Sequence, residues 1–206
     1  MYLGHFAVGF AAKPVAPKVS LGILLVATQV IDILYAVFVF VGIAQPGAAS
    51  PWDHGLVMSF IWSLLAFVIA FLFYRDIRSG IIIGILVLSH WILDFIAWDY
   101  ALPLAFKDSP LVGLGLFNSV VVMIVGDFGL FAVGIAIYLT RTKAIDRTGK
   151  WAPWLLIAYI LALIPACLLP GKLIIITGLA MILVVPLGYW VDRHRLVIPP
   201  LIKSQR

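Results

Sequence analysis

Residues 80–98 read GIIIGILVLSHWILDFIAW, an apolar run long enough to cross a lipid bilayer as a helix. The run nevertheless holds His90 and Asp94, which project from the same face of a helix about one turn apart. An ionisable side chain at membrane depth costs at least ~2.5–3.5 kcal/mol on insertion scales. Another part of the chain must therefore compensate these two groups.

The composition is that of an integral membrane protein. The chain has 206 residues, of which 64% are hydrophobic and 11% charged, whereas soluble domains are about 45–50% apolar and about 25% charged. All nine acidic residues are aspartates. The single cysteine, Cys167, excludes a disulfide framework and suggests a small buried apolar residue.

The apolar runs predict one all-α membrane domain over residues 1–206. Six of them are close to the length of about 20 residues that a spanning helix needs. The apolar stretch before the first run is too short to cross a membrane. Its neighbouring basic residues follow it, whereas those of a secretory signal precede the apolar segment. We expect a short re-entrant or docked helix at 2–12, then spans at about 19–43, 54–74, 80–100, 118–140, 152–170 and 172–191.

Basic residues flank alternate connections between the predicted spans. Lys107 is the only basic residue in the connections at 44–53 and 101–117, and Lys172 lies between the last two apolar runs. The positive-inside rule then predicts that both termini are cytoplasmic, and that the +5 net charge reflects topology and not nucleic-acid binding. The other twelve basic residues are Lys13, Lys18, Arg75, Arg78, Arg141, Lys143, Arg147, Lys150, Arg193, Arg195, Lys203 and Arg206.

Three smaller features predict local structure. Ser20 and Asn118 are expected to cap the first and fourth spans at their N-termini. Gly80 and Gly84 form a GxxxG pattern, which is typical of close contact between membrane helices. Asp53 could cap the second span or support the neighbouring histidine.

Ionisable side chains recur in the first four predicted spans, none of which contains a lysine or arginine. They are Asp32, His54, His90, Asp94 and Asp127, and His5 lies on the leading helix. Lipid cannot solvate the aspartates, so three interpretations remain open. They are protonated and hydrogen-bonded in a structural protein, they line an ion or proton path, or they bind a metal whose charge offsets theirs.

The number of candidate ligands favours the metal. Imidazole and carboxylate together suit zinc, manganese or iron, and six ligands exceed what one tetrahedral ion uses, so one or two ions are feasible. Two common hydrolase motifs are excluded: HExxH requires a glutamate, and no GxSxG occurs.

The chain resembles the YdjM-type membrane-bound metal-dependent hydrolases, in particular a bacterial subgroup of about this length. The similar stretches are LGHFAVGFAAK at 3–13, APKVSLG at 16–22, the Gln29–Asp32 pair, DHGLVMS at 53–59, LSHWILDF at 88–95, GLGLFNS at 113–119 and DRHR at 192–195. The resemblance implies a multi-pass protein of the bacterial inner membrane. It also implies that His5, Asp32, His54, His90 and Asp94 are metal ligands, while Asp127 stands where a glutamate is common.

These observations predict a membrane-embedded hydrolase in which a metal, expected to be zinc, activates water for attack on an ester or phosphoester. Asp127 would be a further ligand or the general base. A lipid or lipid-linked substrate suits a centre at this depth. The alternative is a small proton- or ion-coupled transporter that uses the same aspartates and His90, although no inverted repeat is evident.

Overall fold

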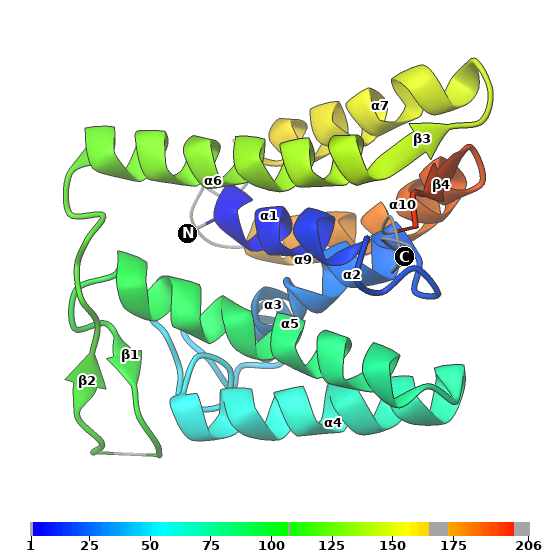
Figure 1. Cartoon of the computed structure of the whole chain (residues 1–206). Helices are drawn as coiled ribbons and strands as arrows, with labels where there is room; N and C mark the ends of the chain where they lie inside the picture. The colour runs from blue at the N-terminus through cyan, green and yellow to red at the C-terminus, as the bar shows by residue number, and fades with distance from the viewer. Residues whose placement is uncertain (1, 107, 165–172, 200–206) are drawn as a thin grey trace, which may run out of the picture.

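The computed structural model describes residues 2–106, 108–164 and 173–199, which are mostly helical. The all-α prediction is confirmed in outline, with two pairs of short antiparallel strands that were not predicted (Figure 1). The helices are α1 (Leu3–Ala12), α2 (Leu21–Ala27), α3 (Val30–Phe40), α4 (Leu56–Tyr74), α5 (Ile77–Ala97), α6 (Val120–Arg141), α7 (Thr148–Ala162), α9 (Leu173–Ile182) and α10 (Val184–Asp192). The strands are β1 (Leu102–Pro103), β2 (Leu111–Val112), β3 (Thr142–Ala144) and β4 (Arg195–Val197).

Three helices, α4, α5 and α6, are long and apolar enough to cross a membrane. They correspond to the predicted spans at 54–74, 80–100 and 118–140. The predicted span at 19–43 is not one straight helix, because α2 and α3 meet at 60° across Thr28 and Gln29. That pair is either a broken span or a re-entrant segment.

The last two predicted spans are shown only in part. Helix α7 has 15 residues, and α9 and α10 are separated at Leu183. Residues 165–172, which include Cys167, lie outside the described part of the chain. Within the described residues the structure therefore has three candidate spans, or up to four if α2 and α3 count as one.

Helices α4 and α5 form an antiparallel hairpin whose contact includes the predicted GxxxG pattern. A Cβ atom added to Gly80 or Gly84 would lie 3.1–3.2 Å from atoms of Phe67 on α4. The Ser63 hydroxyl also donates a 2.7 Å hydrogen bond to the Gly84 carbonyl. The two glycines thus let the helices approach closely, as the sequence predicted.

The predicted N-caps have different outcomes. Ser20 is confirmed, because its hydroxyl accepts a hydrogen bond from the Ile23 backbone N–H at 3.2 Å. The prediction for Asn118 is wrong, because Ser119 is the N-cap residue of α6. Asn118 instead closes a turn, in which its N–H donates to the carbonyl of Gly115, a residue with a φ of +62°.

The leading helix α1 is docked within the molecule, between α6 and α5 (Figure 1). Eight of its ten residues are buried, so it is not an exposed amphipathic helix. Phe10 packs edge-on against Phe131 and Tyr138, which both lie on α6. The absence of a side chain at Gly134 lets the backbone of α6 approach that of Ala7. These contacts position His5 inside the bundle.

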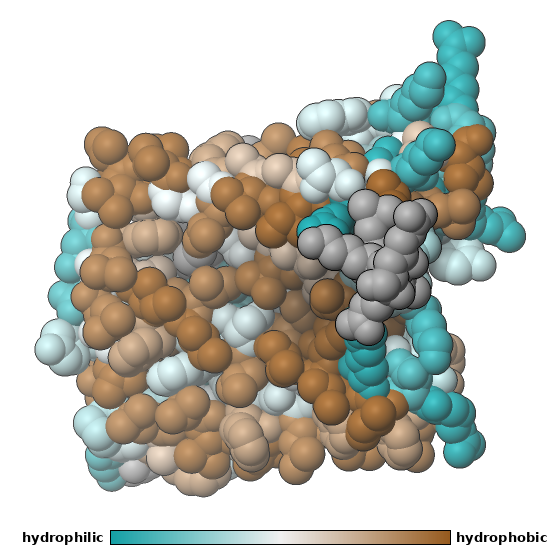
Figure 2. Space-filling model, viewed as in Figure 1, coloured by the Kyte–Doolittle hydropathy of each residue, from teal (hydrophilic) through white to brown (hydrophobic). Residues whose placement is uncertain are grey.

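The segments rich in basic residues meet at one end of the molecule. Lys18 pairs with Asp76 and Lys13 with Asp192, each at 2.9 Å, while β3 pairs with β4. At the opposite end the Val57 N–H donates to the Leu104 carbonyl beside the β1–β2 hairpin. Figure 2 shows a broad apolar band between these two more polar ends, which is the pattern that a membrane-embedded protein requires.

Candidate metal centre

The five predicted metal ligands converge from four segments of the chain. His5 lies on α1, Asp32 on α3, and His90 with Asp94 on α5, while His54 lies just before α4. Their donor atoms form two overlapping groups, each with all its atoms within 4.8 Å of one another. One group is His5, His90 and Asp94, and the other is Asp32, His54 and His90.

The break between α2 and α3 fixes the orientation of His90. The Nδ1 atom of His90 lies 2.8 Å from the carbonyl oxygen of Thr28, the first residue of the break. A carbonyl only accepts hydrogen bonds, so Nδ1 carries the proton in a neutral ring and Nε2 keeps its lone pair. The bend in the first predicted span therefore supplies a backbone support for a histidine on another helix.

His54 is oriented in the same way by Asp53. Its Nδ1 lies 2.7 Å from Asp53 Oδ1, and its backbone N–H donates to the same oxygen. The Asp53 side chain is fully buried, and it also accepts hydrogen bonds from Ser50. Of the two predicted roles for Asp53, the structure shows support of the histidine. Carboxylates placed in this way orient metal-binding histidines and raise their basicity.

The Nε2 atoms of both rings face the same two carboxylates. His90 Nε2 lies 3.2 Å from Asp94 Oδ2 and 3.5 Å from Asp32 Oδ1. His54 Nε2 lies 3.4 Å from Asp32 Oδ1 and 3.8 Å from Asp94 Oδ2. His90 Nε2 is buried and makes no hydrogen bond to any described residue. Lone pairs thus face lone pairs, an arrangement that is stable only with a cation or protons between them.

Three of these four separations match those of donors on one divalent cation. Two donors that each lie about 2.0–2.2 Å from a zinc ion are roughly 3.0–3.5 Å apart. The distances between His90 and Asp94, His54 and Asp32, and His90 and Asp32 are 3.2–3.5 Å, whereas His54 Nε2 and Asp94 Oδ2 are 3.8 Å apart. The side chains of His90 and Asp94 are almost fully buried, whereas that of Asp32 is 28% exposed. Asp32 therefore marks the side on which the cluster is open.

His5 completes the cluster from α1. Its Nε2 atom lies 3.2 Å from Asp94 Oδ1, and its ring stacks on that of His90 with centroids 3.8 Å apart. Its buried Nδ1 has no hydrogen-bond partner within the described residues. Trp98 donates from Nε1 to Asp94 Oδ1 at 3.2 Å. Asp94 thus directs one oxygen to His5 and the other to His54 and His90.

Asp127 is engaged with the backbone of α1. Its carboxylate accepts hydrogen bonds from the N–H groups of Tyr2, Leu3 and Gly4 at 3.3, 3.0 and 2.7 Å. A carboxylate at this position satisfies donors that a helix N-terminus leaves unpaired and interacts favourably with the helix dipole. Asp127 belongs to neither group of candidate ligands. What the geometry shows is a residue that anchors the helix carrying His5.

Sequence reasoning missed two supporting residues. The Thr28 carbonyl is a backbone group, so no motif could reveal it, and the indole of Trp98 is not a metal ligand. A usable signal existed for Trp98, since it follows Asp94 by four residues and shares its helix face.

The amide of Gln29 is a further buried polar group at the break. Its side-chain atoms find no partner in the part of the chain that the structure describes.

No protein-family model, curated protein or solved structure gives a significant match to this chain. The functional conclusion therefore rests on the residues and their geometry.

Proposed function

We propose that the chain is a membrane-embedded, metal-dependent hydrolase whose centre is formed by His5, Asp32, His54, His90 and Asp94. The observation that carries this proposal is the orientation of two imidazoles. The Nδ1 atoms of His90 and His54 contact the Thr28 carbonyl and Asp53, so both Nε2 atoms face the same two carboxylates. The donor set suits zinc best, with manganese or iron as alternatives, and could hold one or two ions.

The proposed reaction is hydrolysis of an ester or phosphoester in a lipid or lipid-linked substrate. A bound divalent cation would lower the pKa of water towards 7 and so supply the nucleophile. Water adds to the acyl carbon or phosphorus, the bond to the ester oxygen breaks, and the alcohol leaves with a proton. Asp32 is the most exposed ligand, so we place the substrate on its side of the cluster. The apolar band on the surface of the molecule supports a lipid substrate.

The test combines metal analysis with turnover. Protein purified without chelator should carry one to two equivalents of a divalent ion, roughly as two-metal hydrolases do, and should hydrolyse a phospholipid or ester probe until the metal is removed. Asp94→Asn should lose both metal and activity. The matched control is Asp99→Asn, which changes an exposed aspartate near the same end of α5 and should keep both. Metal-free protein that takes up neither zinc nor manganese would overturn the proposal.

For Asp127 we propose a positioning role through α1, in place of the ligand or general-base role that the sequence suggested. Asp127→Asn should then lower metal affinity and melting temperature together, because the first turn of α1 loses a charged acceptor. A general base would behave differently, since its loss would abolish turnover with metal occupancy unchanged.

A second candidate function, an ion- or proton-coupled transporter, is favoured by the broken pair α2–α3. Discontinuous helices commonly form the ion sites of transporters, and the break here contacts the cluster through His90. Proteoliposomes separate the two functions. A transporter would carry ions across the membrane and lose that flux in Asp32→Asn, whereas the proposed hydrolase shows turnover without flux.

We also propose that all six apolar runs span the bacterial inner membrane, with both termini cytoplasmic. The basic segments gathered at one end support this orientation through the positive-inside rule. In a Cys167→Ser background, an external thiol reagent should label Ala48→Cys but not Asp146→Cys. Labelling of position 146 alone would reverse the orientation.

A further inference from the structure

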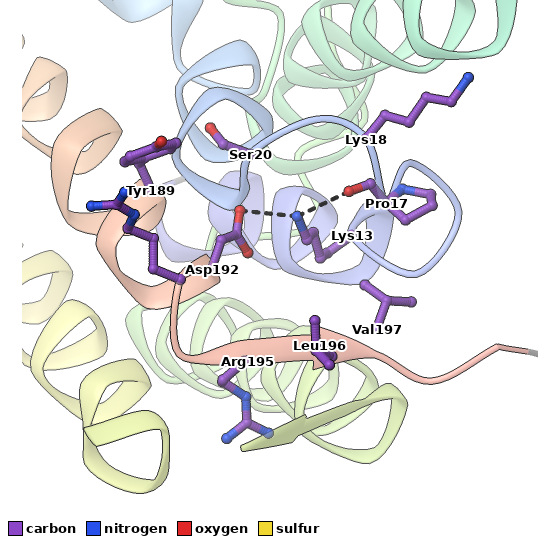
Figure 3. A pocket seen from close by; sticks show the side chains of 10 residues that line it. Lys13, Pro17, Lys18, Ser20, Tyr189, Asp192, Arg195, Leu196 and Val197 are labelled. Carbon is purple, nitrogen blue, oxygen red and sulfur yellow. Dashed lines mark hydrogen bonds and ion pairs between the residues drawn. The ribbon is translucent and has the colours of Figure 1, made fainter. Parts of the chain in front are cut away.

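A recess of about 460 Å³ opens at the basic end of the molecule, and no residue of the histidine–aspartate cluster lines it. It lies between the segment that connects α1 to α2, the end of α10, and β4 (Figure 3). Its lining includes four basic side chains, Lys13, Lys18, Arg193 and Arg195, against one acid, Asp192.

Two of the four basic side chains are held by the protein itself. Lys13 is 6% exposed and donates to Asp192 Oδ2 at 2.9 Å and to the carbonyls of Val19 and Pro17 (Figure 3). Arg195 donates to Thr142 and to the Gly149 carbonyl. Because Lys13 and Arg195 donate to acceptors of the protein, a ligand would have to be bound by the other two basic side chains, Lys18 and Arg193.

Lys18 and Arg193 are the exposed basic side chains of the lining. The side chain of Lys18 is 67% exposed, and it pairs at 2.9 Å with Asp76, whose side chain is 22% exposed. Arg193 is exposed, with its guanidinium over the ring of Tyr189. Tyr189 and Leu196 line the same recess and are more than half exposed. The recess therefore offers positive charge next to apolar surface.

We propose that this recess binds the phosphate group of an anionic phospholipid, with Lys18 and Arg193 as the charged contacts and Tyr189 beside the head group. Basic recesses between membrane helices suit anionic head groups, because phosphate oxygens accept charge-assisted hydrogen bonds from Lys and Arg. A tyrosine at the boundary of the apolar band favours the same depth. The proposal is independent of the metal centre.

Binding to the purified full chain in neutral detergent can be measured by native mass spectrometry. The probes are phosphatidylglycerol, phosphatidylcholine as the lipid without net charge, and inorganic phosphate. Lys18→Gln and Arg193→Gln should each weaken phosphatidylglycerol binding about fivefold and together about 25-fold. The matched control is the pair Arg147→Gln and Lys150→Gln, exposed basic residues at the same end that do not line the recess.

The control pair should bind within about twofold of the wild type, as should the charge-preserving pair Lys18→Arg and Arg193→Lys. Equal losses in the control pair would overturn the proposal in favour of diffuse attraction. Unchanged binding in the Lys18 and Arg193 variants would also overturn it. If inorganic phosphate binds through these residues and phosphatidylglycerol does not, the lipid assignment is overturned. Metal content should be unchanged in every variant, which separates this test from that of the metal centre.

Discussion

Aspartates at the two ends of the helical bundle face opposite kinds of neighbours. At the basic end, Asp192 accepts from the Lys13 ammonium and the Leu21 N–H, and Asp76 accepts from Lys18 and from both donors of Ser79. Each of these two carboxylates accepts hydrogen bonds from a lysine ammonium and from other donor groups of the protein. Donors and acceptors are therefore matched within the protein at this end.

In the cluster, Asp32 and Asp94 face the Nε2 atoms of His54 and His90. Those nitrogens have no proton to donate when the rings are neutral, because Asp53 and the Thr28 carbonyl occupy Nδ1. The cluster therefore has an excess of acceptors, whereas the basic end has matched pairs. Acceptors that converge on one point in excess could hold a metal ion, whereas matched pairs indicate a scaffold.

The largest effect on stability is expected at the basic end, in Lys13→Met. The substitution leaves the partly buried Asp192 without its cation, and breaking a buried ion pair costs about 3–5 kcal/mol in the free energy of unfolding. Metal content of the folded protein should not change. Denaturation in detergent measures the first effect and elemental analysis the second.

The double variant Lys13→Met, Asp192→Asn provides the control for this prediction. It removes the stranded charge and keeps an acceptor for the Leu21 N–H, so it should recover most of the lost stability. Loss of metal in Lys13→Met would contradict the separation between scaffold and site.

The next effect is expected in the cluster, in His90→Ala and Asp94→Asn. Each substitution removes a candidate ligand and should strip the metal. The free energy of unfolding should then fall by about 2.7 kcal/mol when the metal is present at 100 times its Kd. The double variant should lose little more than either single variant, because the shared metal is already absent. Thermal unfolding with and without added zinc measures the coupling. Full metal retention in Asp94→Asn would show that the cluster is a hydrogen-bonded core and not a cation site.

A smaller effect is expected one contact away from the metal, in Asp53→Asn. The amide can no longer hold the His54 ring as a charged acceptor, and loss of such a support typically lowers metal affinity about 10- to 100-fold. The full metal complement should return at high zinc concentration, which a titration with a metal indicator measures. Failure to rebind would instead make Asp53 essential to the local fold.

The sequence predicted which ionisable residues come together better than it predicted the architecture around them. His5, Asp32, His54, His90 and Asp94 could be identified because ionisable side chains in apolar runs are rare and must converge to be tolerated. That argument does not depend on the shape of the helices. It therefore survived the finding that residues 19–43 do not form one straight helix.

What the sequence could not predict depends on backbone groups and long-range contacts. The bend at Thr28 leaves no proline or glycine signal, and its carbonyl acts on His90, 62 residues away. Asp127 was placed in the site because an acid inside a membrane helix implies function. Its three partners are N–H groups at the start of α1 and its N-cap residue, about 125 residues away, and no periodicity encodes that pairing.

The smallest effect is expected from Asp76→Asn at the basic end, and it tests whether a matched carboxylate behaves as scaffold. Asp76 caps α5 through Ser79, and these hydrogen bonds, together with Lys18, lower the pKa of its carboxyl below the usual range. Asparagine is an equally good cap, so the melting temperature at pH 7 should fall by no more than about 2 °C. Because the folded pKa is depressed, the stabilisation is complete above the unfolded pKa of about 3.9 and is lost as the pH falls through the folded value. The melting temperature of the wild type should therefore fall more steeply than that of Asp76→Asn from about pH 5 to about pH 2. Parallel curves would mean that the charge of Asp76 contributes nothing to the fold and that only its shape is used.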